Sequence, residues 1–206
     1  MQKFTQLTAI AAPLDIPNIN TDAIVPVRWL NSTSVNLGDK LFANWRYHED
    51  VEENASFVLN KAPFRQAQII VAGPNFGCGS SREHAVWALV KFGIRAVIAP
   101  SFGDIFYDNA FKNGLLPIRI PAGDNEALLA ALQGAADPKL TIDLERCTIA
   151  GPNNRAIDFS IAPERRRLLL TGTDEIDILL GHQAAVARFE QADANDRPWV
   201  YLPPRG

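Results

Sequence analysis

The sequence predicts an α/β fold whose centre is a parallel β-α-β-α-β unit, and three observations in the middle of the chain lead to this prediction. Gln68–Gly73 is a short, continuous apolar run, which is typical of a buried strand. In Arg82–Phe92 the apolar residues recur at i, i+3, i+4 and i+7 from Ala85, which places them on one face of a helix. Further strand and helix patterns follow in alternation, which implies parallel strands with right-handed crossovers.

The central unit continues in the same alternation towards residue 132. Lys91 in the last turn of the first helix and Gly93 just after it are typical of a helix C-terminus. We then expect a strand, a helix, a strand and a helix, in this order: Ala96–Pro100, Asp104–Lys112, Leu115–Ile120 and Asp124–Leu132.

The N-terminal part carries weaker signals. Phe4–Ala11 alternates loosely between apolar and polar residues and predicts a strand. After a turn-rich connection, Thr21–Val27 indicates another short extended stretch. The small and polar residues of Asn31–Asp39 are typical of a loop, and Lys40–Tyr47 predicts a short helix.

The C-terminal third differs in character from the centre. We expect two strands, Leu140–Leu144 and Ala156–Ile161, on either side of a turn at Gly151–Asn154. Two helices are expected to follow, Pro163–Leu170 with a proline near its start and a longer one over Asp174–Glu190, before a frayed end. Residues 1–206 are therefore expected to form a single domain with a C-terminal helical extension.

The composition argues against several classes of protein. The formal net charge is −3 and no basic block occurs, so we expect no nucleic-acid partner. The longest apolar runs are far shorter than the roughly 20 residues that span a bilayer. The N-terminus lacks a long apolar stretch followed by a small-residue cleavage site, and we expect a cytoplasmic chain without membrane contact.

Cysteines and histidines are too few and too scattered to form a metal centre. Cys78 and Cys147 are able to pair in principle, but reduced thiols are favoured in a cytosolic chain. An iron–sulfur cluster takes about four thiolates, and the three histidines lack the spacing of zinc ligands. We therefore expect no cofactor bound by this chain alone, and any metal must come from elsewhere.

The segment Gly73–His84 (GPNFGCGSSREH) carries the strongest functional signal. It joins a buried strand to a helix N-terminus, where free backbone N–H groups and the positive end of the helix dipole meet. Gly77 and Gly79 allow a ligand to approach the backbone closely. Arg82 adds a planar cation suited to carboxylates. Together these residues predict a small anion site.

A structural interpretation competes with this one. Ser80 and Glu83 have the spacing of a capping box, in which the serine caps the helix and the glutamate reaches back. A cap requires neither a second serine nor a pair of glycines. Arg82 in the first turn also opposes the dipole, at a cost of about 0.3–1 kcal/mol. Residues that break a local rule are often functional, which favours the anion site.

Other motifs fail on spacing. A Walker loop needs a lysine before Ser80, and the dinucleotide fingerprint needs a glycine where Arg82 stands. Cys78 has two interpretations, an activated thiolate near a helix N-terminus or, more commonly, a small buried thiol. His84, one turn into the helix, is expected to support its neighbours.

The residues of this segment, Asn75–Ala85, closely resemble the signature of the small-subunit family of 3-isopropylmalate dehydratases and, more loosely, the C-terminal swivel domain of aconitase. Asn20–Pro26 is similar to the family's N-terminal Thr-Asp segment. Ser101–Pro117 resembles a further block of the family, and Arg165–Leu180 resembles its C-terminal helix region less tightly. The resemblance covers most of the chain.

The resemblance implies a swivelling β/β/α domain that serves as the small subunit of a hydro-lyase interconverting 2-isopropylmalate and 3-isopropylmalate in leucine biosynthesis. It implies a large-subunit partner with a 4Fe–4S cluster that binds the dicarboxylate substrate. In this pattern Ser80 is the base that removes the carbon-bound proton, and Asp22 is the active-site aspartate. The residues expected to bind substrate are Ser81, Arg82, Gly79 and Thr21.

One loop departs from the family. Family members carry basic residues after the Thr-Asp segment, whereas residues 31–38 contain no cation, and Arg28, Lys40 and Arg46 do not stand at the matching place. Two alternatives therefore stay open. One is the small subunit of a related methylmalate or dimethylmalate dehydratase, and the other is a non-catalytic carboxylate-binding module.

Overall fold

The computed structural model describes residues 1–30, 35–152 and 156–201. The chain divides into two compact units, Met1–Gly172 and Thr173–Gly206. The organisation as a single domain with a helical extension stays a prediction. Within the described residues, no helix is long and apolar enough to cross a membrane.

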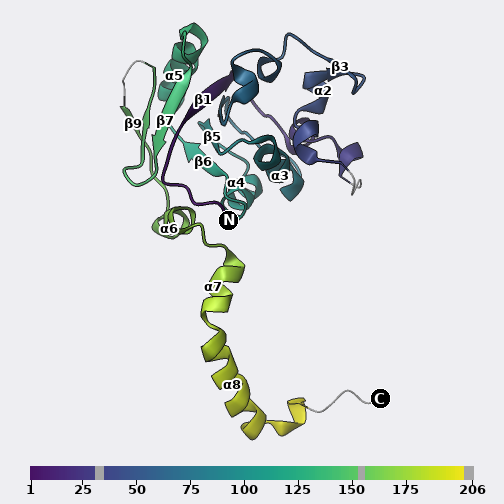
Figure 1. The fold of residues 1–206 in the computed structure, drawn as a ribbon, viewed down its shortest axis with the longest axis vertical. Coiled ribbons are helices and arrows are strands. Elements are labelled where there is room, and N and C mark those ends of the chain that lie inside the picture. Colours follow the sequence, from purple (N-terminus) through teal and green to yellow (C-terminus); the bar gives the residue numbers. More distant parts are fainter. Residues whose placement is uncertain (31–34, 153–155, 202–206) are drawn as a thin grey trace. The chain divides into compact units, whose positions relative to one another are not determined.

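A curled, mixed sheet with a parallel part and an antiparallel part forms the centre of the first unit (Figure 1). In the described residues it has seven strands in the order β6-β5-β4-β1-β7-β8-β9. The strands β1, β4, β5 and β6 are parallel, and β7, β8 and β9 continue the sheet in antiparallel pairing. Their bounds are Gln6–Leu14 (β1), Ile69–Ala72 (β4), Ala96–Ala99 (β5), Leu116–Arg119 (β6), Lys139–Asp143 (β7), Thr148–Ala150 (β8) and Ala156–Asp158 (β9). The predicted α/β class with a parallel centre is confirmed.

Helices cover the sheet because its central strands are apolar on both faces. In β4, Ile70 belongs to one buried cluster with Leu89 of the helix α3 (Glu83–Phe92). Ile69 and Val71 belong to a second cluster with Leu128 of the helix α5 (Ala122–Gly134). Alternate side chains of a strand point to opposite faces, so a continuous apolar run such as β4 is buried on both sides. The helices of this unit with more than one turn are Glu83–Phe92 (α3), Asp104–Lys112 (α4), Ala122–Gly134 (α5) and Pro163–Thr171 (α6).

The segment predicted to be extended at Thr21–Val27 is instead a helical turn, α1, over Thr21–Ile24. Asn20 caps it, since its Oδ1 accepts a hydrogen bond of 2.8 Å from the backbone N–H of Ala23. An asparagine cap stabilises a helix start at a short apolar segment that the alternation pattern alone assigns to a strand. This correction determines where the aspartate of the Thr-Asp segment lies.

Short elements fill the insertion between β1 and β4. The helix α2 (Ala43–Arg46) falls inside the helix predicted at Lys40–Tyr47, and a two-stranded ribbon pairs β2 (Tyr47–His48) with β3 (Glu52–Glu53). The described part of this insertion also contains 3₁₀ turns at Val27–Trp29, Leu37–Lys40, Val58–Asn60 and Phe64–Gln66. Residues 31–34 of the predicted loop lie outside the described residues.

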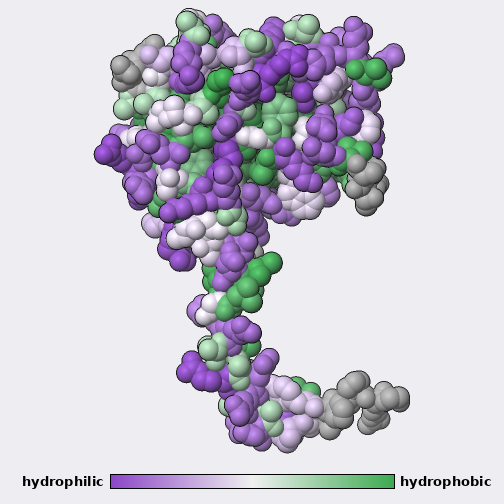
Figure 2. All heavy atoms as spheres, in the orientation of Figure 1, coloured by the Kyte–Doolittle hydropathy of each residue, from purple (hydrophilic) through white to green (hydrophobic). Residues whose placement is uncertain are grey.

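The second unit is helical. The helix predicted over Asp174–Glu190 is divided into α7 (Glu175–Gly181) and α8 (Gln183–Asp196), followed by a 3₁₀ turn at Pro198–Tyr201. Figure 2 shows hydrophobic residues on the surface of this unit. Leu179 and Phe189 are among its exposed apolar residues.

Candidate active site

The loop between β4 and α3 has a backbone that requires glycine. Gly77 has a φ of +72°, and a Cβ added there would lie 2.2 Å from Cγ of Phe106. Gly79 has a φ of +97°, but an added Cβ would meet nothing nearer than 3.5 Å. Gly77 is therefore required by packing as well as conformation, whereas Gly79 is required by conformation at an exposed position.

The N-terminal segment Ile19–Thr21 lies against this loop. The N–H of Gly77 donates to the carbonyl of Ile19 at 2.7 Å, and the N–H of Thr21 donates to the carbonyl of Cys78 at 2.9 Å. Asn20 and Cys78 form an isolated parallel bridge. Backbone bonds thus hold the Thr-Asp segment beside the glycine-rich loop.

Ser80 is exposed at the end of the loop, and Thr21 is buried directly beneath it. The Thr21 hydroxyl donates to the carbonyl of Ser80 at 3.2 Å and lies 3.4 Å from the Ser80 hydroxyl oxygen. Thr21 is 2% exposed, whereas Ser80, Ser81 and Gly79 are exposed. Of the predicted site residues around the loop, Gly79, Ser80 and Ser81 therefore lie on the surface, whereas Thr21 is buried.

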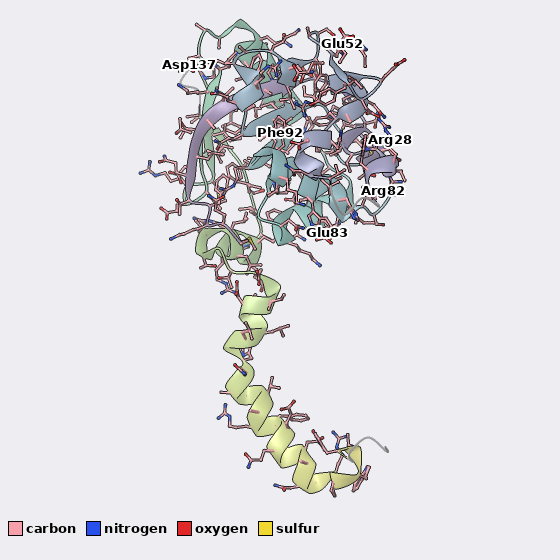
Figure 3. The ribbon with its side chains drawn as sticks, turned by 45° about the vertical axis from the view of Figure 1, so that its right-hand side comes forward. Arg28, Glu52, Arg82, Glu83, Phe92 and Asp137 are labelled. Carbon is pink, nitrogen blue, oxygen red and sulfur yellow. The ribbon has the colours of Figure 1, made fainter. Side chains whose placement is uncertain are left out.

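Arg82 pairs with Asp22 across the site. Its Nη1 donates to Oδ1 of Asp22, and the side chains are 23% and 52% exposed. Figure 3 shows Arg82 on the same side of the first unit as Arg28. The loop and the N-terminal turn α1 thus bring a cation, an aspartate and two serines to one surface.

The capping box that the spacing of Ser80 and Glu83 indicates is absent. The helix α3 begins at Glu83, and its N-cap is Arg82, whose side chain makes no capping hydrogen bond. Glu83 accepts a hydrogen bond of 2.8 Å from Nδ2 of Asn113, and Asn113 accepts one of 2.9 Å from Nε1 of Trp87. The structural interpretation of Ser80 as a helix cap is therefore wrong. The contact to Asn113, 30 positions away, has no signal in the local pattern.

The three cations considered for the variable loop are all engaged with other groups. Arg28 donates to both carboxylate oxygens of Asp50, at 3.0 and 2.6 Å, and to Asn44 at 2.8 Å. The hydrogen bond from Arg28 lowers the pKa of the Asp50 carboxyl. Lys40 lies over the ring of Trp29, with its Nζ 4.1 Å from the ring centre.

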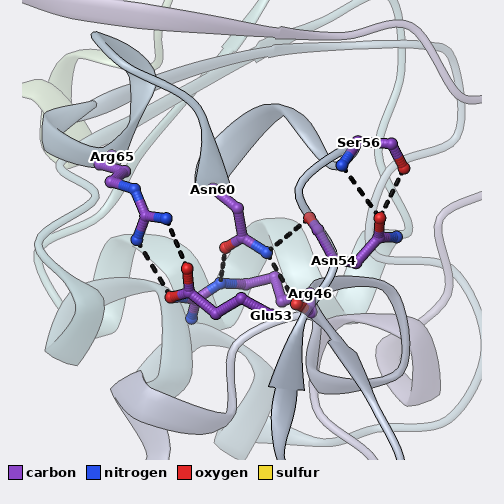
Figure 4. A network of polar contacts seen from close by, with 6 residues as sticks. All are labelled: Arg46, Glu53, Asn54, Ser56, Asn60 and Arg65. Carbon is purple, nitrogen blue, oxygen red and sulfur yellow. Dashed lines mark hydrogen bonds and ion pairs between the residues drawn. The ribbon is translucent and has the colours of Figure 1, made fainter.

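Arg46 is buried in a polar network that the sequence did not reveal (Figure 4). Its Nε donates to Oδ1 of Asn60 at 3.1 Å, and its guanidinium lies 4.9 Å from the centre of the Phe92 ring. Burial lowers the pKa of Arg46. Asn60 in turn donates to the carbonyls of Arg46 and Asn54, at 2.7 and 3.0 Å. Arg46 therefore serves the packing of this insertion.

The cysteines of the described residues do not fit an iron–sulfur cluster. Within the described ranges, no group of three or more histidine, cysteine, aspartate or glutamate side chains is placed to hold a metal ion. Cys78 and Cys147 are both partly buried and are not joined in a disulfide. The open alternative of a disulfide between them is wrong.

Comparisons with known proteins place these features in a family. The aconitase C-terminal domain family matches residues 1–123. The 3-isopropylmalate dehydratase small subunit of Granulibacter bethesdensis is 52% identical over 200 residues, which cover 97% of this chain and 96% of that protein. The protein of the same name from Afipia carboxidovorans is 50% identical over 201 residues, covering 97% and 100%.

A solved structure agrees with these relatives. The structure of 3-isopropylmalate dehydratase from Methanocaldococcus jannaschii matches with a TM-score of 0.63 and 29% sequence identity. The match covers 89% of this chain and 98% of that chain.

Proposed function

This chain belongs to the small-subunit family of 3-isopropylmalate dehydratases, and we propose that, assembled with a large subunit, it interconverts 2-isopropylmalate and 3-isopropylmalate by dehydration and rehydration. Membership of the family makes the chain a subunit of a hydro-lyase of leucine biosynthesis. The name that the relatives carry implies a large-subunit partner.

We propose that Ser80 is the base and that Arg82 binds a substrate carboxylate. The observation that carries this proposal is the position of Ser80, which is exposed beside the Arg82–Asp22 pair and does not cap α3. Removing a proton next to a carboxylate builds negative charge on the substrate. A guanidinium and oriented N–H groups stabilise that charge more in the transition state than in the ground state.

Asp22 orients Arg82 in this proposal. The ion pair is formed through Nη1 of Arg82, and a guanidinium has five N–H donors. A substrate carboxylate is therefore able to bind the remaining N–H donors of Arg82 while Asp22 holds the guanidinium in place. Ser81 and Gly79 contribute an exposed hydroxyl and an exposed backbone beside this carboxylate.

Because Ser80, Ser81 and Gly79 are exposed, these residues are able to form one wall of a larger active site. We propose that the large subunit supplies the other wall and the 4Fe–4S cluster, because the described residues of this chain include no group placed to hold a metal ion. The reacting hydroxyl of the substrate would be bound on the partner's side, and the carbon-bound proton would be removed on this side.

A related methylmalate or dimethylmalate dehydratase remains the second candidate. One observation favours it: Arg28, the nearest cation before the uncharged residues 31–38, is held by Asp50 and Asn44. Both candidates share the proposed roles of Ser80 and Arg82.

The experiment is reconstitution. The purified chain and a family large subunit with an intact cluster are mixed, and turnover of 2-isopropylmalate is measured for the mixture and for each chain alone. We expect turnover only from the mixture. Turnover by the isolated chain in metal-free buffer would contradict the proposed division of labour. Conversion of methyl-substituted malates in preference to isopropylmalates would favour the second candidate.

A further inference from the structure

Thr21 contacts the glycine-rich loop between β4 and α3 at three points. Its backbone N–H donates to the carbonyl of Cys78 at 2.9 Å. Its hydroxyl donates to the carbonyl of Ser80 at 3.2 Å and lies 3.4 Å from Oγ of Ser80. The residue is 2% exposed, so its side chain is covered by the loop that presents Ser80. A threonine in this position contacts the serine and offers almost no surface to a substrate.

The Ser80 carbonyl is held from two sides. It accepts the Thr21 hydroxyl, and it also accepts the backbone N–H of Arg82 at 2.8 Å. A carbonyl oxygen has two lone pairs, so these two bonds occupy both of them. These two hydrogen bonds fix the backbone conformation at Ser80 and between Ser80 and Arg82.

The Thr21 hydroxyl has one proton and two acceptors within reach. It donates to one of them at a time, and a hydroxyl proton rotates to the better acceptor. While Ser80 is protonated, the Thr21 proton lies on the Ser80 carbonyl and Thr21 Oγ1 is able to accept the Ser80 hydroxyl. Once Ser80 is deprotonated, its Oγ carries the charge, and hydrogen bonds to a charged oxygen are roughly twice as strong as neutral ones.

We propose that Thr21 is a positioning residue for Ser80: its buried hydroxyl fixes the Ser80 turn and, when Ser80 is deprotonated, redirects its hydrogen bond from the Ser80 carbonyl to the Ser80 oxygen. The substrate proton is transferred to Ser80 Oγ, and Thr21 keeps its own proton throughout. The Ser80 carbonyl retains the N–H of Arg82 when the Thr21 hydroxyl rotates away. This inference rests on the proposed role of Ser80 as the base.

The test compares Thr21→Val and Thr21→Ser in the full chain assembled with the large subunit. Valine has nearly the shape of threonine without the hydroxyl, whereas serine keeps the hydroxyl. For Thr21→Val we expect kcat to fall about 10–100-fold, because one hydrogen bond to a charged group is lost. We expect KM to change less than about twofold and Thr21→Ser to recover most of kcat.

The pH profile separates this role from a merely structural one. The base is active when deprotonated, so losing a donor to the charged oxygen raises the pKa of the serine, and the acid limb of kcat moves to higher pH. A purely structural role would reduce the amount of assembled enzyme but leave kcat per assembled complex and its pH profile unchanged. Thermal unfolding and affinity for the large subunit measure that loss directly.

Thr8→Val is the matched control, because Thr8 is exposed and its hydroxyl oxygen lies 2.9 Å from that of a second threonine, Thr141, on the neighbouring strand. A raised KM with unchanged kcat in Thr21→Val would assign Thr21 to substrate binding and overturn the proposal, as would an unchanged kcat and pH profile. If Thr21→Val does not fold, Thr21→Cys replaces the hydroxyl by a weak donor, and the same two readouts decide. An inactive wild-type complex would instead refute the proposed function.

Discussion

Arg82 and Asp22 stand 60 positions apart in the sequence, and Nη1 of Arg82 donates to Oδ1 of Asp22. The pair joins the N-cap of α3 to the first turn of α1. Half-exposed ion pairs contribute only about 0.2–1 kcal/mol to stability. The pair is therefore better explained as orientation of the guanidinium than as a source of stability.

The first prediction concerns the planar geometry of Arg82. Arg82→Lys keeps the charge but loses the two-pronged binding of a carboxylate, so we expect kcat/KM of the assembled enzyme to fall about 10–100-fold on every malate homologue alike. Arg65→Lys is the control, because Arg65 is an exposed arginine paired with Glu53. Equal activity of the two variants would remove Arg82 from substrate binding.

The second prediction separates catalysis from capping at Ser80. Because Ser80 does not cap α3, Ser80→Ala should avoid the loss of about 0.5–2 kcal/mol that follows removal of a cap. Turnover of the assembled enzyme should fall by roughly 10²–10⁴. Urea unfolding and steady-state turnover are measured on the same preparation, with the exposed Ser56→Ala as control. A folded, assembled Ser80→Ala with normal turnover would show that another group is the base.

The centre of the fold was predictable because the signals for its strands and helices come from residues that are close together in the sequence. Both faces of β4 are buried, so Gln68–Gly73 reads as one apolar run, and α3 has a clear apolar face that ends at Gly93 with a φ of +110°. The pairing of β1 with β4 on one side and with β7 on the other depends on contacts between distant residues. The strand β8, Thr148–Ala150, was not predicted, and its pairing with β7 and β9 joins it to residues elsewhere in the chain.

The site was only partly predictable for the same reason. The residues of the glycine-rich loop stand together in the sequence, and the resemblance supplied the Thr-Asp segment. The competing capping-box interpretation was wrong, because Glu83 accepts a hydrogen bond from Asn113, 30 positions away, and no local pattern reveals that contact. The burial of Thr21 under Ser80 likewise arises from the contact of two distant segments.

The third prediction concerns the glycines of the loop. Gly77→Ala places a methyl group against the ring of Phe106 at a positive φ, so we expect a loss of about 2–5 kcal/mol in the free energy of unfolding. For Gly79→Ala we expect a smaller loss of about 1–2 kcal/mol in the free energy of unfolding, because only the positive φ disfavours alanine there. Gly123→Ala, in the helix α5 with open space around it, should be neutral or stabilising. Thermal and urea unfolding give the order, and an equal loss at Gly77 and Gly79 would contradict the packing argument.

The last prediction assigns substrate choice to residues 30–38, part of which lies outside the described residues. This stretch is uncharged, while the nearby Arg28 is held by Asp50 and Asn44. The shared carboxylate is assigned to Arg82, so the variable side chain of the malate must be recognised elsewhere. Exchanging Leu30–Gly38 for a basic version from a relative should therefore change which malate homologue is preferred, whereas Arg82→Lys should slow all of them alike.

Turnover of the assembled variants on 2-isopropylmalate, 3-isopropylmalate and methyl-substituted malates measures both effects. Arg28→Gln is a useful companion variant, because it removes a cation two positions before the exchanged segment without altering the segment itself. If the substrate ranking follows the exchanged segment and not Arg28, specificity lies in residues 30–38. A substrate ranking that is unchanged by the exchange would show that residues 30–38 do not recognise the variable side chain. A ranking altered by Arg82→Lys would show that Arg82 recognises it. Either result would contradict the assignment.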